Sequence, residues 1–178
     1  MDALTQLQRR LAHLEAGEAI RALKHRYLRA CDDKDPLAMR ACFVPEGAHI
    51  HYDRIGSFNS GEALAQCFAE LGCRPSLLEM HFAGHADIVV EDAGLARGTW
   101  DLAYLGLDQL AGISTFLTGR YADEYALVDG VWLIRSTVFT TRVLTQGSVP
   151  VGSWGGSLGA SSGAVTERVM SSRGASRG

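Results

Sequence analysis

Two histidines that lie four residues apart are the first side chains in this sequence that could do chemistry. His81 and His85 fall in residues 80–90, a segment that alternates like a strand, so both should lie on one face if the strand is regular. An imidazole that faces an enclosed space suits a general base, because imidazole exchanges protons near neutral pH. Two alternatives are a metal site, for which no carboxylate at suitable spacing completes the ligand set, and a hydrogen-bonded structural histidine.

An acidic residue at the end of the first predicted helix is the second candidate. Tyr27 and Asp32 close this helix. A carboxylate is poorly placed there, because the helix dipole is negative at its C-terminus. Asp32 therefore either has a compensating partner or is exposed in the polar turn formed by residues 32–35, as turn residues often are.

Further polar side chains alternate along the predicted strands and could line a pocket. The strand periodicity does not say which of their faces points inward. These residues are Tyr52, Asp101, Tyr104, Tyr121, Asp123, Tyr125 and Arg142.

The elements that must position these residues begin with helices. Apolar residues at three- and four-residue spacing predict an amphipathic helix over residues 4–28, which Gly17 could bend or break. Asp35-Pro36 marks the start of a short second helix over residues 37–43, and Ser60 caps a third through residue 71. A short strand over residues 48–52, with its return over residues 54–59, lies between the second and third helices.

Long runs rich in β-branched and aromatic residues follow the helices. They span residues 80–90, 95–107, 113–128 and 131–144, and the last two are joined by Asp129-Gly130, a strong signal for a two-residue hairpin turn. Helices followed by an antiparallel meander predict an α+β fold. We expect a helical arm at residues 1–17, one domain at residues 18–146, and a Gly/Ser-rich tail at residues 147–178 that does not order itself.

Composition excludes several classes of function. The chain has 178 residues, of which 47% are hydrophobic, and a formal net charge of -3, so one globular domain is expected and nucleic acid is not an expected partner. No apolar run is long enough to cross a bilayer and the N-terminus does not resemble a signal peptide, so the expected location is cytoplasmic. The cysteines, Cys31, Cys42, Cys67 and Cys73, form no CxxC pair and are expected to be buried reduced thiols.

Several segments, in this order and spacing, resemble the SnoaL-like branch of the NTF2-like superfamily over residues 18–143. The segments are EAIRALKHRYLRACDDKD, EMHFAGHADIVVED, ARGTWDL and GRYADEYALVDGVWLI. Among its members the sequence is most similar to bacterial bile-acid 7α-dehydratase, and more distantly to scytalone dehydratase and hexachlorocyclohexane dehydrochlorinase. The resemblance implies a cone-shaped α+β barrel (NTF2-like or cystatin-like), in which N-terminal helices close a curved antiparallel sheet around an apolar pocket.

The resemblance also implies a site. Tyr27, Asp32 and His81 match the tyrosine, aspartate and histidine of the dehydratases, so Asp32 would orient His81. The sequence departs from the bile-acid enzyme at two places: Tyr104 replaces an aspartate, and Thr141 stands where that enzyme has an arginine. Arg142 follows one residue later, so in a regular strand its side chain points to the opposite face. Only a bulge in the strand would turn it toward the pocket. The residues expected to contact the substrate are Tyr52, His85, Tyr104, Tyr121 and Arg142.

The implied activity is elimination of water from a hydroxylated, hydrophobic cyclic or steroid-like substrate, with no metal or organic cofactor. His81 would remove a proton beside a carbonyl group, and Tyr27 or Tyr104 would hydrogen-bond the carbonyl or the departing hydroxyl. The alternatives are a double-bond isomerase of the ketosteroid-isomerase type and a non-catalytic ligand-binding protein. A homotrimer or homodimer is expected, because a bent sheet leaves an outer apolar face uncovered. The test that separates enzyme from binder is whether Asp32 and His81 meet in the pocket.

Overall fold

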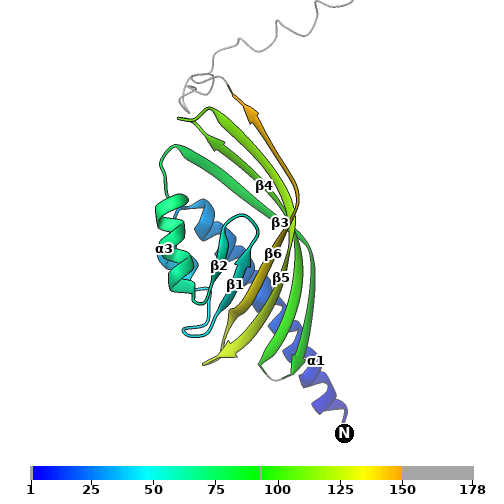
Figure 1. The fold of residues 1–178 in the computed structure, drawn as a ribbon. Helices are drawn as coiled ribbons and strands as arrows, with labels where there is room; N and C mark the ends of the chain where they lie inside the picture. The colour runs from blue at the N-terminus through cyan, green and yellow to red at the C-terminus, as the bar shows by residue number, and fades with distance from the viewer. Residues whose placement is uncertain (1, 93, 150–178) are drawn as a thin grey trace, which may run out of the picture.

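A computed structural model describes residues 2–92 and 94–149. Helices and a strongly curved sheet face one another across a common core (Figure 1). In chain order the elements are α1 (Ala3–Asp32), α2 (Pro36–Arg40), β1 (His49–Tyr52), β2 (Gly56–Phe58), α3 (Gly61–Leu71), β3 (Leu77–Asp92), β4 (Leu95–Asp108), β5 (Ile113–Val128) and β6 (Val131–Ser148). The α+β class predicted from the sequence is confirmed.

The strands form one open sheet in the order β2-β1-β6-β5-β4-β3. The four long strands pair as antiparallel neighbours, as expected, but β1 pairs with β6 in parallel. The predicted curved sheet with N-terminal helices packed on it is confirmed, but the sheet does not close on itself into a barrel and one of its strand pairs is parallel. β2 and β3 are the two edges of the sheet, and helices α1 and α3 cover its concave side instead of further strand pairing (Figure 1).

The turn between β5 and β6 has the conformation that its sequence predicts. Asp129 and Gly130 both have positive φ, 49° and 80°, which is the combination that a type I′ turn requires. Glycine adopts this conformation without strain, and Asp is among the few other residues that tolerate it. The twist of such a turn matches that of the flanking strands, so it fixes the register next to the turn, where Val128 pairs with Val131 and Leu127 with Trp132.

Helix α1 runs unbroken from Ala3 to Asp32 with Gly17 buried inside it, so the helix does not break at Gly17, one of the two possibilities that the sequence left open. Its C-terminal half packs against the sheet and its N-terminus lies beyond the ends of the strands (Figure 1). None of the described helices is long and apolar enough to cross a membrane. The predicted tail begins within β6, at Gly147 and Ser148, and lies outside the described residues from residue 150 onward.

A buried ion pair joins α1 to the middle of the sheet. The ammonium group of Lys24 lies 2.8 Å from Oδ2 of Asp123 on β5, and both side chains are fully buried. Asp123 also accepts hydrogen bonds from Thr137 and Tyr125, and the Trp100 indole donates to the Tyr125 hydroxyl. Desolvation lowers the pKa of Lys24, and Asp123 opposes that shift. Every polar group in this part of the core thus has a partner, as burial requires.

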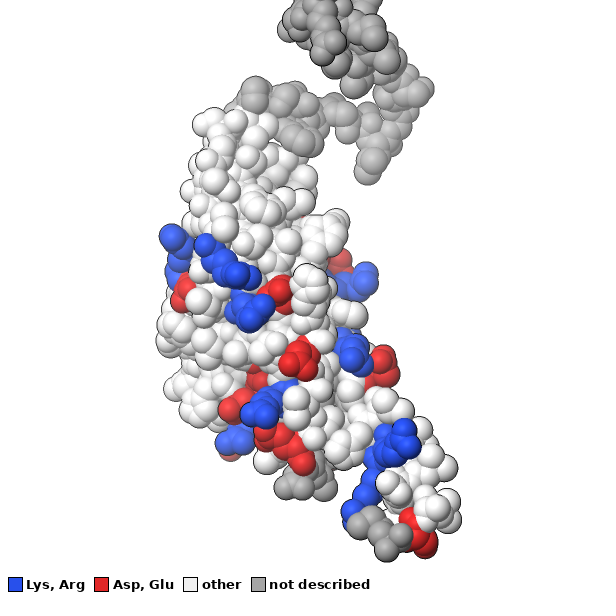
Figure 2. Space-filling model, turned by 90° about the vertical axis from the view of Figure 1, so that its right-hand side faces the viewer, with Lys and Arg blue, Asp and Glu red and all other residues white. Residues whose placement is uncertain are grey.

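The outer face of the sheet carries large apolar side chains that are left exposed. Leu78, Met80, Leu105 and Phe116 line a shallow hollow on this face, near the ends of β3, β4 and β5. Figure 2 views this side, and no Lys, Arg, Asp or Glu is visible at its upper end.

Removing one partner of the buried pair should be costly, because the other charge stays buried without compensation. We expect Lys24→Met to lower the free energy of unfolding by about 3 to 5 kcal/mol. Arg21→Met, one turn earlier, breaks the exposed pair with Glu18 and should cost less than about 1 kcal/mol. Urea unfolding followed by circular dichroism measures both, and equal losses in the two variants would contradict a structural role for the buried pair.

Candidate active site

A cavity of about 340 Å³ lies between the helices and the concave side of the sheet. Its walls are mostly apolar, with a few polar groups directed toward it, which is the usual composition of a small-molecule site. The lining residues supplied by α1, α2 and α3 are Tyr27, Cys31, Met39, Leu64, Cys67, Phe68 and Leu71. Those supplied by the strands are Tyr52, Glu79, His81, Leu102, Tyr104, Leu117, Tyr121 and Phe139.

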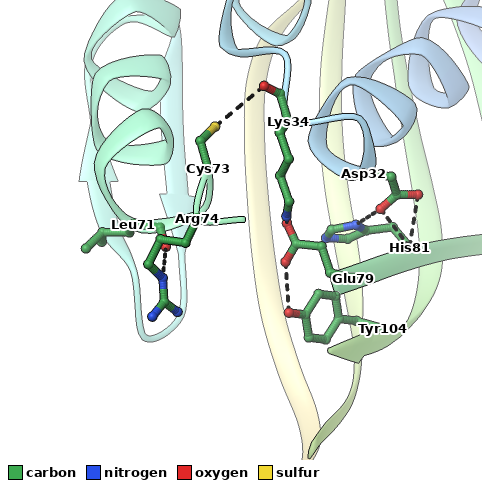
Figure 3. A network of polar contacts seen from close by, with 8 residues as sticks. All are labelled: Asp32, Lys34, Leu71, Cys73, Arg74, Glu79, His81 and Tyr104. Carbon is green, nitrogen blue, oxygen red and sulfur yellow. Dashed lines mark hydrogen bonds and ion pairs between the residues drawn. The ribbon is translucent and has the colours of Figure 1, made fainter. Parts of the chain in front are cut away.

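Asp32 and His81 meet at this cavity. Oδ1 of Asp32 lies 2.6 Å from Nδ1 of His81, and the backbone N–H of His81 donates to both carboxylate oxygens at 3.1 and 3.3 Å (Figure 3). The carboxylate therefore receives three contacts from one residue of β3. These donors supply the partner that a carboxylate at the end of α1 needs against the helix dipole.

The contact with Asp32 decides which nitrogen of the imidazole can act as a base. A carboxylate only accepts hydrogen bonds, so it favours the tautomer with the proton on Nδ1. Nε2 is then the unprotonated nitrogen of the neutral ring. His81 lines the cavity, so this nitrogen is the group in the site best suited to remove a proton from a bound molecule.

Two phenols form a second polar group in the cavity wall. The hydroxyls of Tyr27 and Tyr52 lie 2.7 Å apart, and Tyr121 packs edge-on against Tyr52. Burial raises the pKa of both Tyr27 and Tyr52, so both hydroxyls keep their protons. One hydroxyl donates to the other, which leaves one phenolic hydrogen that this contact does not use.

A third polar group was not predicted. Glu79 lies two residues before His81, on the same face of β3, and it also lines the cavity. Its carboxylate forms an ion pair with Lys34 and accepts a hydrogen bond of 2.9 Å from the Tyr104 hydroxyl (Figure 3). Burial and the neighbouring Glu79 raise the pKa of Tyr104. The alternation that places His81 also places Glu79, so strand periodicity counted from His81 could have found it.

The structure does not place His85 in the cavity, because a bulge in β3 shifts the phase of the strand. The register with β4 slips between Gly84 and Asp87, and His85 has a positive φ of 49°. Ala86, Ile88 and Val90 consequently pack inward, whereas the side chain of His85 is 87% exposed and bonds Asp101. The expectation that His85 shares a face with His81, which held only for a regular strand, was therefore wrong.

Arg142 also lies outside the cavity. A register shift between β5 and β6 does fall at this residue, since Thr118 pairs with Val143 and Gly119 with Thr141. This irregularity leaves Arg142 exposed beside a separate shallow groove that Asp53 and Arg54 also line. The structure thus gathers Tyr27, Asp32, Tyr52, His81, Tyr104 and Tyr121, but neither His85 nor Arg142.

All four cysteines are free, as predicted, but only Cys31 and Cys42 are buried, whereas Cys67 and Cys73 are partly exposed. Cys31 lines the cavity, but burial raises the pKa of its thiol to about 12, so it is a poor nucleophile near neutral pH. Within residues 2–92 and 94–149, no three His, Cys, Asp or Glu side chains gather as a metal site would need.

Comparison with known proteins agrees with this architecture. The family model described as a SnoaL-like domain matches residues 12–138. No curated protein matches the sequence significantly.

Solved structures share the fold at low sequence identity. A hexachlorocyclohexane dehydrochlorinase superposes with a TM-score of 0.68 at 21% identity, covering 78% of this chain and 96% of the other. A proposed scytalone dehydratase from Novosphingobium aromaticivorans gives 0.68 at 19% identity, covering 78% and 95%. A protein of unknown function with a cystatin-like fold, from Nostoc punctiforme, gives 0.56 at 16% identity, covering 80% and 94%.

Proposed function

The chain belongs to the SnoaL-like domain family, and from this premise we propose that it is a dehydratase that acts on a small, hydrophobic, cyclic β-hydroxy ketone. The observation that carries the proposal is the contact between Asp32 and His81 at the wall of an apolar cavity. The similar solved structures include a dehydrochlorinase and a proposed dehydratase, which supports a small-molecule-processing enzyme.

The proposed reaction needs only the side chains of the cavity. Nε2 of His81 takes a proton from the carbon beside the substrate carbonyl, and Asp32 stabilises the imidazolium that forms. The resulting enolate oxygen accepts a hydrogen bond from the Tyr27–Tyr52 pair. The imidazolium then returns its proton to the hydroxyl on the next carbon, the C–O bond breaks, and the enolate electrons form the new double bond. Water and an unsaturated ketone leave, and His81 is neutral again.

The enclosed setting strengthens each of these contacts. Tyr27 and Tyr52 are almost completely buried, so their hydrogen bonds act in a medium of low dielectric constant. The phenols have raised pKa values, and therefore donate hydrogen bonds to the enolate without giving up their protons. Stabilisation by fixed donors of this kind is a major source of catalysis in enolisation.

Cavity size favours a substrate of one or two rings. A volume of about 340 Å³ lies near the lower end of the roughly 300–1,000 Å³ that small-molecule sites span. A bile-acid substrate is disfavoured further by the two sequence departures, since Tyr104 replaces an aspartate and Arg142 lies outside the cavity. We therefore propose a compact alicyclic or benzo-fused ketol in place of a steroid.

The proposal predicts turnover of 3-hydroxy-1-tetralone, a two-ring β-hydroxy ketone. Loss of water followed by tautomerisation yields 1-naphthol, which is fluorescent and lighter by one water. We expect His81→Ala to lower the rate by about 100-fold or more, because general base catalysis contributes on that scale. Asp32→Asn should also slow the reaction, since an amide can donate to Nδ1 and so favour the wrong tautomer.

His85→Ala is the matched control, because it removes an exposed histidine of the same strand that lies outside the cavity. It should retain the wild-type rate. Equal rates in His81→Ala and His85→Ala, or no turnover above the uncatalysed reaction, would contradict the proposal and favour ligand binding. Conversion of cyclohex-3-enone to its conjugated isomer, without turnover of the hydroxy ketone, would indicate an isomerase that uses the same base.

The exposed outer face of the sheet supports a second proposal, that copies of this chain associate. Phe116 and Met80 sit in the apolar hollow on that face. Phe116→Asp should shift a dimer or trimer toward monomer in light scattering after size-exclusion chromatography. Leu37→Asp, which changes an exposed leucine of α2 on another surface, is the control. A wild-type protein that is monomeric at all concentrations would contradict the proposal.

A further inference from the structure

Glu79 is a buried carboxylate that the proposed reaction does not use. Its side chain is only 7% exposed, and it lies beside the base on the same strand. A buried carboxylate is costly unless it is paired and hydrogen-bonded. Here Lys34 supplies the opposite charge and Tyr104 supplies a hydrogen bond (Figure 3).

This arrangement fixes the direction of the hydrogen bond at Tyr104. A carboxylate paired with an ammonium group is ionised and can only accept, so the Tyr104 hydroxyl donates its hydrogen to Glu79. The phenolic oxygen is then left with its lone pairs for any further partner. Tyr104 therefore cannot stabilise an enolate oxygen, which needs a donor, although its phenol lies in the cavity wall.

Lys34 holds the carboxylate in place from the turn between α1 and α2. Its backbone has a positive φ of 59°, and its carbonyl lies 3.7 Å from the Cys73 thiol, which donates to it from the segment after α3. The Lys34 ammonium group pairs with Glu79 on the strand. Lys34 is thus a positioning residue for Glu79, and through it for Tyr104.

The two polar walls of the cavity consequently have opposite character. The Tyr27–Tyr52 pair offers a hydrogen-bond donor, whereas Tyr104 and Glu79 offer acceptors. The acceptor wall adjoins the base, because the rings of Tyr104 and His81 lie 4.9 Å apart between centroids. A substrate that satisfies both walls needs an acceptor at one end and a donor close to the carbon that loses its proton.

We propose that Tyr104 and Glu79 form an acceptor subsite that selects substrates by the hydroxyl group they carry next to the reacting carbon. This inference rests on the proposed function and extends it: the subsite recognises the hydroxyl that departs, while the tyrosine pair recognises the ketone. Because the hydroxyl donates its own hydrogen to Tyr104, its oxygen keeps a lone pair for the proton that His81 returns. An analogue with a halogen, an ether or no group at this position leaves the subsite unpaired.

Binding of two matched ligands tests the subsite without turnover. The ligands are 3-hydroxy-1-tetralone and 1-tetralone, which differ only by the hydroxyl. Their dissociation constants are measured by calorimetry in a His81→Gln background, where the base is absent and the side chain keeps a similar length. We expect the hydroxylated ligand to bind about tenfold more tightly, the effect of one well-made hydrogen bond.

Variants in the same background identify the groups responsible. Tyr104→Phe should abolish the preference and leave the affinity for 1-tetralone unchanged, which also shows that the cavity is still folded. Glu79→Gln should reduce the preference, because an amide both donates and accepts and no longer fixes the phenolic hydrogen. Glu91→Gln is the matched control: it removes a more exposed carboxylate of the same strand, paired with Arg97, and should leave the preference unchanged.

Three results would contradict the proposed subsite. They are equal affinity for the two ligands in the His81→Gln background, a preference for the hydroxylated ligand that survives Tyr104→Phe, and an equal loss of affinity for both ligands in Tyr104→Phe. None of these depends on catalysis. If wild-type protein forms no 1-naphthol while the preference and its loss in Tyr104→Phe are observed, the dehydratase proposal fails and the subsite stands.

Discussion

The carboxylate of Asp32 fixes the end of α1 to β3, and the geometry of the cavity follows from that contact. His81 on that strand makes three contacts with it through two donors: its backbone N–H reaches both carboxylate oxygens, and its ring Nδ1 reaches one of them. The same α1 places Tyr27 in the cavity one and a half turns earlier, and the turn after it carries Lys34. A change in how α1 meets β3 would therefore move the base, a phenol donor and the partner of Glu79 together.

The buried pair of Lys24 and Asp123 supports this placement from the other side of the core. It connects α1 to β5, and the ammonium group lies 3.4 Å from the centroid of the Tyr121 ring. Tyr121 in turn packs against Tyr52 in the cavity wall. A fully buried ion pair offsets the cost of desolvation only when its two groups are well aligned, so this pair also restricts the position of α1 along the sheet. The position of α1 therefore determines both the orientation of the cavity phenols and that of the His81 ring.

Much of this architecture follows from local patterns in the sequence. The helical spacing predicted α1, Ser60 predicted the start of α3, and Asp129-Gly130 predicted the hairpin between β5 and β6. The contact of Asp32 with His81 was predicted from a resemblance, supported by the poor placement of a carboxylate at a helix end. These features depend on residues that are neighbours in the chain, or on an electrostatic misfit that demands a partner.

The features that were not predicted depend on long-range geometry. The bulge that turns His85 outward and the irregularity at Arg142 arise from strand register, which local alternation does not encode. The parallel pairing of β1 with β6 needs the whole chain to be in place. Lys24 sits on the apolar face of α1 between Leu23 and Tyr27, and that position alone could have indicated a buried partner.

The protonation state of the His81 ring tests the proposed chemistry most directly. Long-range proton–nitrogen NMR of nitrogen-15-labelled protein, at mildly alkaline pH, distinguishes a protonated from an unprotonated ring nitrogen. We predict a neutral ring with the proton on Nδ1 and a free Nε2, and a loss of that preference in Asp32→Asn. A wild-type ring protonated on Nε2 would leave no base facing the cavity and would contradict the proposed chemistry.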